Sequence, residues 1–222
     1  MSFFSSLVAQ TAAERELLYS VPQIHDGLAG RISRKTYVDY LKEAYHHVRH
    51  TVPLMQATKA RLDDGHARFR DALDDYIAEE TGHEEWILND IGHAGGNAEA
   101  ARASQPRFET EMMVAYAYDY VARVNPMGFF GMVFVLEGTA TQLATRGADG
   151  LRASLGLPAA AFSYLNSHGA LDQEHILFLK SLLDSVEDEG DRAAIVHMAQ
   201  RMFQLYAAVF SAIPHNRLAH AV

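Results

Sequence analysis

The sequence contains no cysteine among its 222 residues. Disulfide bonds, iron–sulfur clusters, thiolate zinc sites and cysteine nucleophiles are therefore excluded. It also lacks any stretch of about 18 apolar residues, the length needed to cross a bilayer. Its first four residues, Met1-Ser2-Phe3-Phe4, have none of the positive charge that opens a secretory signal. The lack of a signal-like N-terminus and of a long apolar run predicts a cytoplasmic protein without a membrane partner; the lack of cysteine does not bear on the compartment.

Positive charge is scarce as well. The 19 Lys and Arg residues are outnumbered by 28 Asp and Glu, which gives a formal net charge of −9. The basic residues form no dense stripe, so nucleic acid is not an expected partner. Hydrophobic residues make up 49% of the chain, enough for a substantial core. Length and composition together predict a single folded domain over residues 1–222.

Glycine and proline occur at long intervals, and the segments between them have helical rather than strand periodicity. Ser33 is a typical N-cap for the second of these segments, and Pro53 predicts a kink within it. The pattern predicts an all-α protein, a compact bundle of seven helices. Their expected ranges are 6–20, 34–62, 65–91, 106–123, 126–146, 158–184 and 188–213.

The most informative local pattern places His168, Asp172 and His175 on one helix. At about 100° per residue these positions fall within roughly 60° of one another, so two imidazoles and a carboxylate project from one face. Leu165 and Leu179 make the rest of that face apolar, as expected of a site inside a bundle. The alternative is a solvated polar face with an incidental Asp–His pair.

A second pattern is Glu-x-x-His, formed by Glu80 and His83. Helical bundles that bind two metals use this i,i+3 spacing to place a carboxylate and an imidazole on one ion. Glu79 is an alternative carboxylate, at i,i+4 from His83. Gly82 lowers helix stability in the middle of the segment and would let a neighbouring helix approach closely. The alternative is an exposed acidic helix with a chance histidine.

A third candidate is Glu137, which ends a run of otherwise uncharged, mostly apolar residues. Burying a lone carboxylate is unfavourable unless it is paired or bound to a metal. The alternative is a glutamate at a helix end that reaches solvent beside Gly138.

Three histidines on the predicted second helix, His46, His47 and His50, form the fourth candidate. Positions 46 and 50 share a face, and so do positions 47 and 50. One of them would add a ligand or a hydrogen bond that orients a ligand. The other interpretation is that they are surface or core histidines, and the spacing does not decide which of them faces inward.

Taken together, the candidate ligands are three carboxylates and three imidazoles: Glu80, His83, Glu137, His168, Asp172 and His175, with His47 and His50 as additional candidates. A mixed nitrogen and oxygen set without thiolate suits iron, with manganese as the alternative. Two metal ions fit six protein ligands better than one ion does, and they leave open coordination positions. No catalytic residue is predicted beyond these ligands.

Several of these segments resemble a known family. They are the opening residues Pro22 to Gly30 with Tyr37, Tyr40, Leu41 and Tyr45; the segment Glu79-Glu80-Thr81-Gly82-His83; and Leu136-Glu137-Gly138 with the later His168, Asp172 and His175. The sequence is similar here to the heme-oxygenase-like diiron oxidases and oxygenases of the wider TenA and PqqC superfamily. The resemblance implies a seven-helix bundle, two non-haem iron ions, O2 as co-substrate and an unidentified electron donor. It also implies a small organic substrate, amino-acid-like or fatty-acid-like, and a homodimer.

The chain departs from the family on the helix that carries His46, His47 and His50, where many members have a further glutamate. A histidine-substituted site and a mononuclear iron site therefore both remain open. Thiaminase activity is excluded because it needs a cysteine. Two other functions stay as alternatives: binding or degradation of haem, with His25 or one residue of His46–His50 as axial ligand, and a non-catalytic helical binding protein with a vestigial metal site.

Overall fold

The computed structural model describes residues 2–216, except for the side chains of 140–146 and 168–174. Within that range the chain forms twelve α-helices and three short 3-10 helices, at 64–66, 126–128 and 159–161. The predicted all-α class is therefore confirmed. The helices are α1 Phe3–Gln10, α2 Ala12–Tyr19, α3 Pro22–Leu28, α4 Arg34–Val48, α5 Thr51–Lys59, α6 Ala67–Glu80, α7 His83–His93, α8 Ala98–Arg102, α9 Phe108–Arg123, α10 Phe129–Leu155, α11 Ser163–Asp184 and α12 Glu189–Ala212.

The predicted number of seven helices is wrong, mainly because three expected helices are each divided. The segment 6–20 breaks at Thr11, whose hydroxyl bonds back to the carbonyl of Leu7. The segment 34–62 begins at the expected cap, Ser33, which accepts a hydrogen bond from the backbone N–H of Thr36. It divides four residues before Pro53, because the proline ring would clash with a helical carbonyl at that distance.

The third division separates α6 from α7 at Thr81 and Gly82. Two short helices, α3 and α8, were not predicted at all. At the other extreme, α10 runs nine residues beyond its expected end at 146, through two glycines to Leu155. Glycine is only mildly unfavourable within a helix, so tertiary packing can carry a helix through it.

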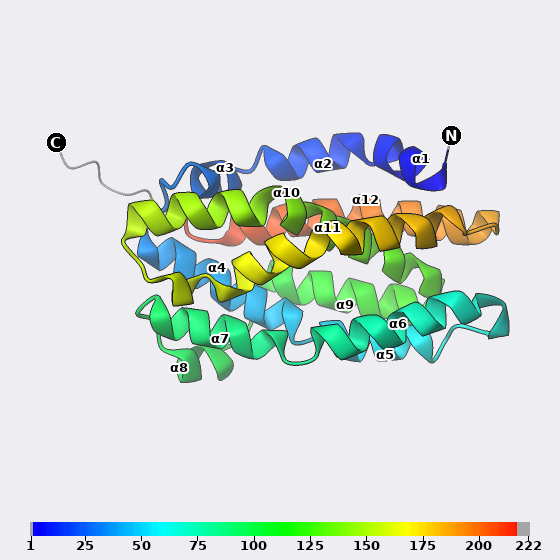
Figure 1. Cartoon of the computed structure of the whole chain (residues 1–222), viewed down its shortest axis with the longest axis horizontal. Helices are drawn as coiled ribbons and strands as arrows, with labels where there is room; N and C mark the ends of the chain where they lie inside the picture. The colour runs from blue at the N-terminus through cyan, green and yellow to red at the C-terminus, as the bar shows by residue number, and fades with distance from the viewer. Residues whose placement is uncertain (1, 217–222) are drawn as a thin grey trace.

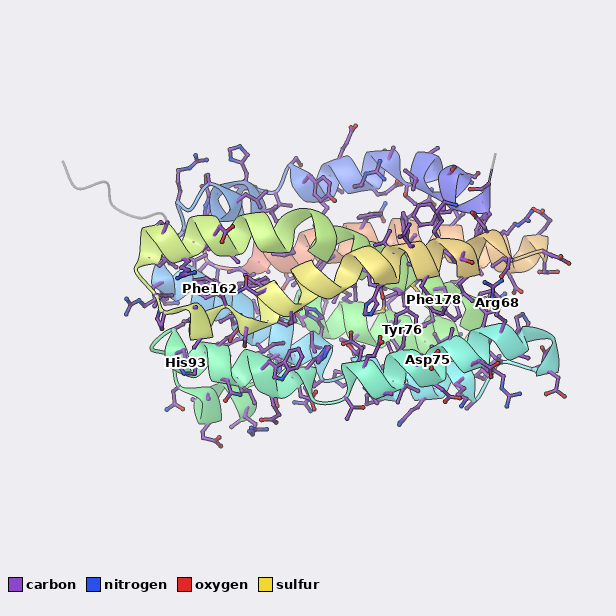
Figure 2. The ribbon with its side chains drawn as sticks, in the orientation of Figure 1. Arg68, Asp75, Tyr76, His93, Phe162 and Phe178 are labelled. Carbon is purple, nitrogen blue, oxygen red and sulfur yellow. The ribbon has the colours of Figure 1, made fainter. Side chains whose placement is uncertain are left out.

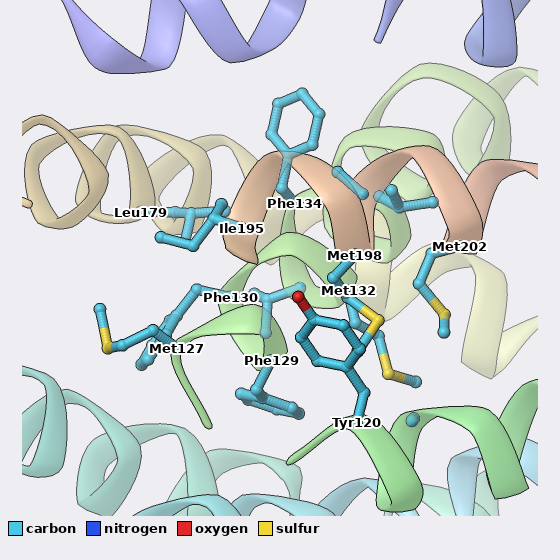
Figure 3. Packing of buried hydrophobic residues seen from close by; sticks show 14 of the residues in the cluster. Tyr120, Met127, Phe129, Phe130, Met132, Phe134, Leu179, Ile195, Met198 and Met202 are labelled. Atoms are coloured by element: carbon cyan, nitrogen blue, oxygen red, sulfur yellow. The ribbon is translucent and has the colours of Figure 1, made fainter. Parts of the chain in front are cut away.

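Helix α10 is the central element of the bundle and packs most extensively on α11 and α12 (Figure 1). Helices α1–α3 lie along one side of it, and α6–α8 lie on the opposite side of the molecule. Gly131 allows the close approach of α10 to α12, since a Cβ atom there would lie 2.2 Å from the carbonyl oxygen of Ile195. Phe130, Met198 and Met202 fill the interior next to this crossing (Figure 3).

A second apolar cluster lies around the first half of α4. Tyr37 is fully buried there and stacks on Phe162, with ring centroids 5.1 Å apart. Its hydroxyl donates to the carbonyl oxygen of Ala161 at 2.7 Å. Leu151 of α10 belongs to the same cluster. The far end of α10 is thereby connected to α4 and α7.

His66, which directly precedes α6, connects the start of that helix to the start of α12. Its Nδ1 lies 2.7 Å from Asp63 and its Nε2 lies 2.9 Å from Asp191. Partial burial opposes the charge on the imidazole, but hydrogen bonds to the two carboxylates outweigh it and raise the pKa of His66. The protonated imidazole therefore links two elements that are distant in the sequence.

We expect this linkage to make stability depend on pH. A group whose pKa is raised on folding contributes fully below its unfolded value, near 6.5 for histidine, and loses that contribution as pH rises through the folded value. Urea unfolding from pH 5.5 to 9 should show the advantage of the wild type over His66→Gln shrinking with pH. His93→Gln, at an exposed position on α7, is the control. A difference that does not vary with pH would contradict a charged His66.

The break between α6 and α7 makes a prediction about Gly82, which has φ +96°. Any side chain is strained in that conformation, so Gly82→Ala should lower the free energy of unfolding by about 1–2 kcal/mol. Gly138→Ala is the matched control, because no described atom lies within 4 Å of a Cβ built at either position and Gly138 lies inside α10. At position 138, alanine should raise the free energy of unfolding by up to ~1 kcal/mol. Equal effects in chemical denaturation would refute this interpretation of Gly82.

Candidate metal centre

A cavity of about 180 Å³ opens between α3, α4, α5, α10, α11 and α12. Most of its wall is apolar and aromatic. Among the described side chains no lysine, arginine or aspartate lines it, and its acidic and imidazole groups are Glu80, Glu137, His47 and His175. Three of the predicted ligands, Glu80, Glu137 and His175, thus border one space although they come from three different helices.

The Glu80–His83 pair forms, but not in the way the spacing predicts. Glu80 is the last residue of α6 and His83 the first of α7, so the two do not share a continuous helix. Gly82, in a left-handed conformation, separates the two helices, and His83 Nδ1 lies 2.8 Å from Glu80 Oε2. The expectation that Gly82 admits a neighbouring helix is wrong, since no atom lies within 4 Å of a Cβ built there.

Glu137 lies in the interior of α10, eighteen residues before its end. The alternative of a helix-end glutamate that reaches solvent is therefore wrong. Its Oε2 atom is buried, and the side chain borders the cavity. A carboxylate in such surroundings requires nearby donors or cations, as expected of a ligand position.

His175 contacts a carboxylate that was considered only for His83. Its Nε2 atom lies 3.1 Å from Oε2 of Glu79, which is half exposed. Adjacent glutamates at the end of α6 therefore serve different histidines: Glu79 meets His175 of α11, and Glu80 meets His83 of α7. The sequence spacing alone favoured His83 as the partner of both glutamates.

Tyr76 is a residue of this site that the sequence reasoning missed. Its ring makes an edge contact with His175, with centroids 6.0 Å apart, and it lies beside Phe178 of α11 (Figure 2). Burial raises the pKa of Tyr76, and the carboxylates of Glu137, Glu79 and Glu80 raise it further. The available signal was its position on α6, one helical turn before the two glutamates.

Of the three histidines near the end of α4, only His47 lines the cavity. Its Nδ1 is 3.0 Å from the carbonyl oxygen of Glu43, which fixes Nδ1 as the protonated nitrogen, and its ring contacts Tyr206. His46 points instead to Ser104, at 2.9 Å. His50 lies against Tyr118 of α9. His50 is therefore not placed at the cavity, and His47 is the candidate that remains.

The predicted ligands His168 and Asp172 belong to α11, but their side chains lie outside the described residues. Among the side chains that the structure describes, no three acidic or imidazole groups are close enough together to hold a metal ion. What the described part of the site contains is two carboxylate–imidazole pairs, one additional buried carboxylate and a tyrosine.

Residues 38–207 match the family described as iron-containing redox enzymes. The chain belongs to this family. No curated protein matches the sequence. In the described residues of this family member, no helix is both long and apolar enough to span a bilayer.

Solved structures agree on the fold. A domain of unknown function from Shewanella denitrificans, with a heme oxygenase-like fold, has a TM-score of 0.86 at 21% identity and covers 96% of this chain and 92% of its own. A TenA homolog from Pseudomonas syringae has a TM-score of 0.80 at 12% identity, covering 95% and 91%. A heme oxygenase from the cyanobacterium Synechocystis, in complex with heme, has a TM-score of 0.72 at 12% identity, also covering 95% and 91%. The heme oxygenase-like fold is thus shown.

The start of α11, which carries His175, is positioned by Asp90 of α7. Asp90 is fully buried and accepts hydrogen bonds from the backbone N–H groups of Ser163 and Tyr164, at 3.0 and 2.9 Å, and from the Ser163 hydroxyl. A carboxylate at this position satisfies N–H groups that have no partner within the helix.

This contact predicts that two variants of the protein lose stability to different extents. Asp90→Ala should lower the free energy of unfolding by about 2–3 kcal/mol, because two buried N–H groups lose their acceptor. Ser163→Ala removes only the hydroxyl contact and should cost about 1 kcal/mol. Urea denaturation measures both, and equal losses would show that the backbone contacts contribute nothing.

Proposed function

We propose that this chain is a non-haem diiron oxidase or oxygenase that uses O2 and an external electron donor to oxidise a small organic substrate. One observation carries the proposal: Glu80, Glu137 and His175 come from three helices to the wall of a cavity that is otherwise mostly apolar. Membership in the iron-containing redox enzymes supports the choice of metal.

The proposed ligands are Glu80, His83, Glu137, His168, Asp172 and His175. Carboxylate and imidazole donors without sulfur fit iron, and this is the donor chemistry of the described groups at the cavity. Glu80 is a hydrogen-bond partner of the His83 imidazole, and Glu79 lies 3.1 Å from the imidazole of His175. His47 is the remaining candidate for an additional ligand, because it lines the same cavity.

When bound, two ferrous ions would supply electrons for the reduction of O2. The protein's own contribution is the environment. Phe129, Met132 and Val133 form an apolar wall next to Glu137 and limit the access of water. Tyr76 keeps its phenolic proton, since burial and adjacent carboxylates raise its pKa, and so holds a proton next to Glu137.

Iron content tests the proposal directly. After anaerobic loading with Fe(II), the wild type should hold two irons per chain and consume O2 in the presence of reductant. Glu137→Gln and His175→Ala should bind iron at least ~10-fold more weakly, because each removes a ligand. His50→Gln, which alters a histidine outside the cavity, should retain both irons. Two irons and wild-type O2 uptake in folded His175→Ala would refute the ligand assignment.

Haem binding is a second candidate, favoured by the solved heme oxygenase that has this fold. His25 is a poor axial ligand here, since its side chain is 72% exposed and its Nδ1 is 3.7 Å from Asp26. His47 lines the cavity, but 180 Å³ is small against the ~300–1,000 Å³ typical of pockets for drug-sized ligands. A Soret band on haem titration of the wild type, lost in His47→Leu, would replace the diiron proposal.

A further inference from the structure

The cavity extends well beyond the proposed metal site. Besides Met132 and Glu137, its lining includes Gly147 and Leu151, which lie closer to the end of α10. Four tyrosines also line it: Tyr37, Tyr40, Tyr164 and Tyr206. Tyr40 precedes His47 by seven residues on α4, which is about 10 Å of rise, so it lies toward the Leu151 end of the cavity.

Two of these tyrosines have hydroxyl groups with no hydrogen-bond partner among the described residues, Tyr40 and Tyr206. Neither oxygen is among the fully buried side-chain atoms that lack a partner, so both hydroxyls are accessible, and both residues line the cavity. Tyr37 provides the contrast, because its hydroxyl donates to Ala161. Tyr206 is only 7% exposed and still lines the cavity.

Aromatic packing holds the two phenols in place. Phe210 stacks on Tyr40 with ring centroids 5.7 Å apart and makes an edge contact with Tyr206 at 4.8 Å. His47 packs against the other side of Tyr206 at 5.8 Å. Side chains restrained in this way present their hydroxyls with little loss of conformational entropy on binding.

The charge of this end of the cavity limits what can bind. Burial raises the pKa of both Tyr40 and Tyr206, so both remain neutral hydrogen-bond donors. No lysine or arginine among the described residues lines the cavity to balance an anion. A neutral phenol donates a hydrogen bond to a carbonyl or similar neutral acceptor without a counter-charge, so such a group is matched here.

We infer that Tyr40 and Tyr206 form a subsite for the non-reacting end of the substrate, which carries a neutral hydrogen-bond acceptor on an apolar body. This inference rests on the proposed function for the reacting end, next to Glu137 and His175. The volume of 180 Å³ is near that of a cavity of about 150 Å³ that holds benzene, so a compact molecule of one ring or an equivalent chain fits.

Two probes of similar shape test the subsite in the metal-free full-length protein: acetophenone, which has a carbonyl acceptor, and ethylbenzene, which has none. In calorimetric titration, the double variant Tyr40→Phe/Tyr206→Phe should bind acetophenone about tenfold more weakly than the wild type, because one to two hydrogen bonds are lost. Its affinity for ethylbenzene should fall by less than about twofold. Tyr118→Phe, a tyrosine outside the cavity, should change neither affinity. Benzoate should bind the wild type more weakly than acetophenone.

Any of three results would overturn the inference: no binding of either probe to the wild type, equal weakening of both probes in the double variant, or tighter binding of benzoate. Melting temperature is a second readout. Tyr40→Phe and Tyr206→Phe should leave it unchanged or raise it, whereas Tyr37→Phe should lower it by about 2–4 °C because a made hydrogen bond is lost. A drop of that size in Tyr40→Phe and Tyr206→Phe would mean that the hydroxyls serve the fold.

Iron loading separates this inference from the proposed function. The Tyr40→Phe/Tyr206→Phe variant should hold as much iron as the wild type. If the wild type binds no iron but discriminates between the two probes, the subsite stands and the diiron proposal fails. If it binds two irons without that discrimination, the diiron proposal stands and the subsite fails.

Discussion

Burying a carboxylate is so unfavourable that each buried acid of this protein needs a matched partner, and much of the bundle is arranged to supply one. Three of these acids lie at, or accept hydrogen bonds from, the beginnings of helices. Asp90 accepts from the first N–H groups of α11, Glu43 accepts from Arg107 and Thr110 at the start of α9, and Asp191 lies in the first turn of α12 next to His66. Acids that are far apart in the sequence thereby hold the first turns of α9, α11 and α12 in position.

Glu80 and Glu137 are different, because they border the cavity instead of satisfying the start of a helix. Imidazoles and the phenol of Tyr76 surround them, a setting that a cation would balance. Beyond His47, toward Leu151, the same cavity is lined by the phenols of Tyr40 and Tyr206, and no acidic side chain among the described residues lines that part. A cavity with one ionisable end and one neutral hydrogen-bonding end would orient an uncharged substrate with its apolar body between them, which is why the two proposals concern the same space.

The helix breaks are what bring these groups together. The turn at Gly82 lets α6 end on Glu79 and Glu80 while α7 begins on His83, so Glu80 meets His83 across the break and Glu79 meets His175 of α11. The break before Pro53 likewise ends α4 just after His47. In both places a local irregularity that lowers helix stability lies next to the candidate site.

From the sequence alone, the spacing of glycine and proline and the period of the apolar residues determined the all-α class, and the Glu79–His83 and Glu137 segments indicated the family. Those signals depend on residues that are close together in the sequence, so they hold in the folded structure as well. The sequence did not determine the helix ends, the inward-facing histidine among His46, His47 and His50, or the partner of Glu79. Spacing shows which residues share a face of one helix, but only the packing of α4, α6, α10 and α11 decides what each face meets.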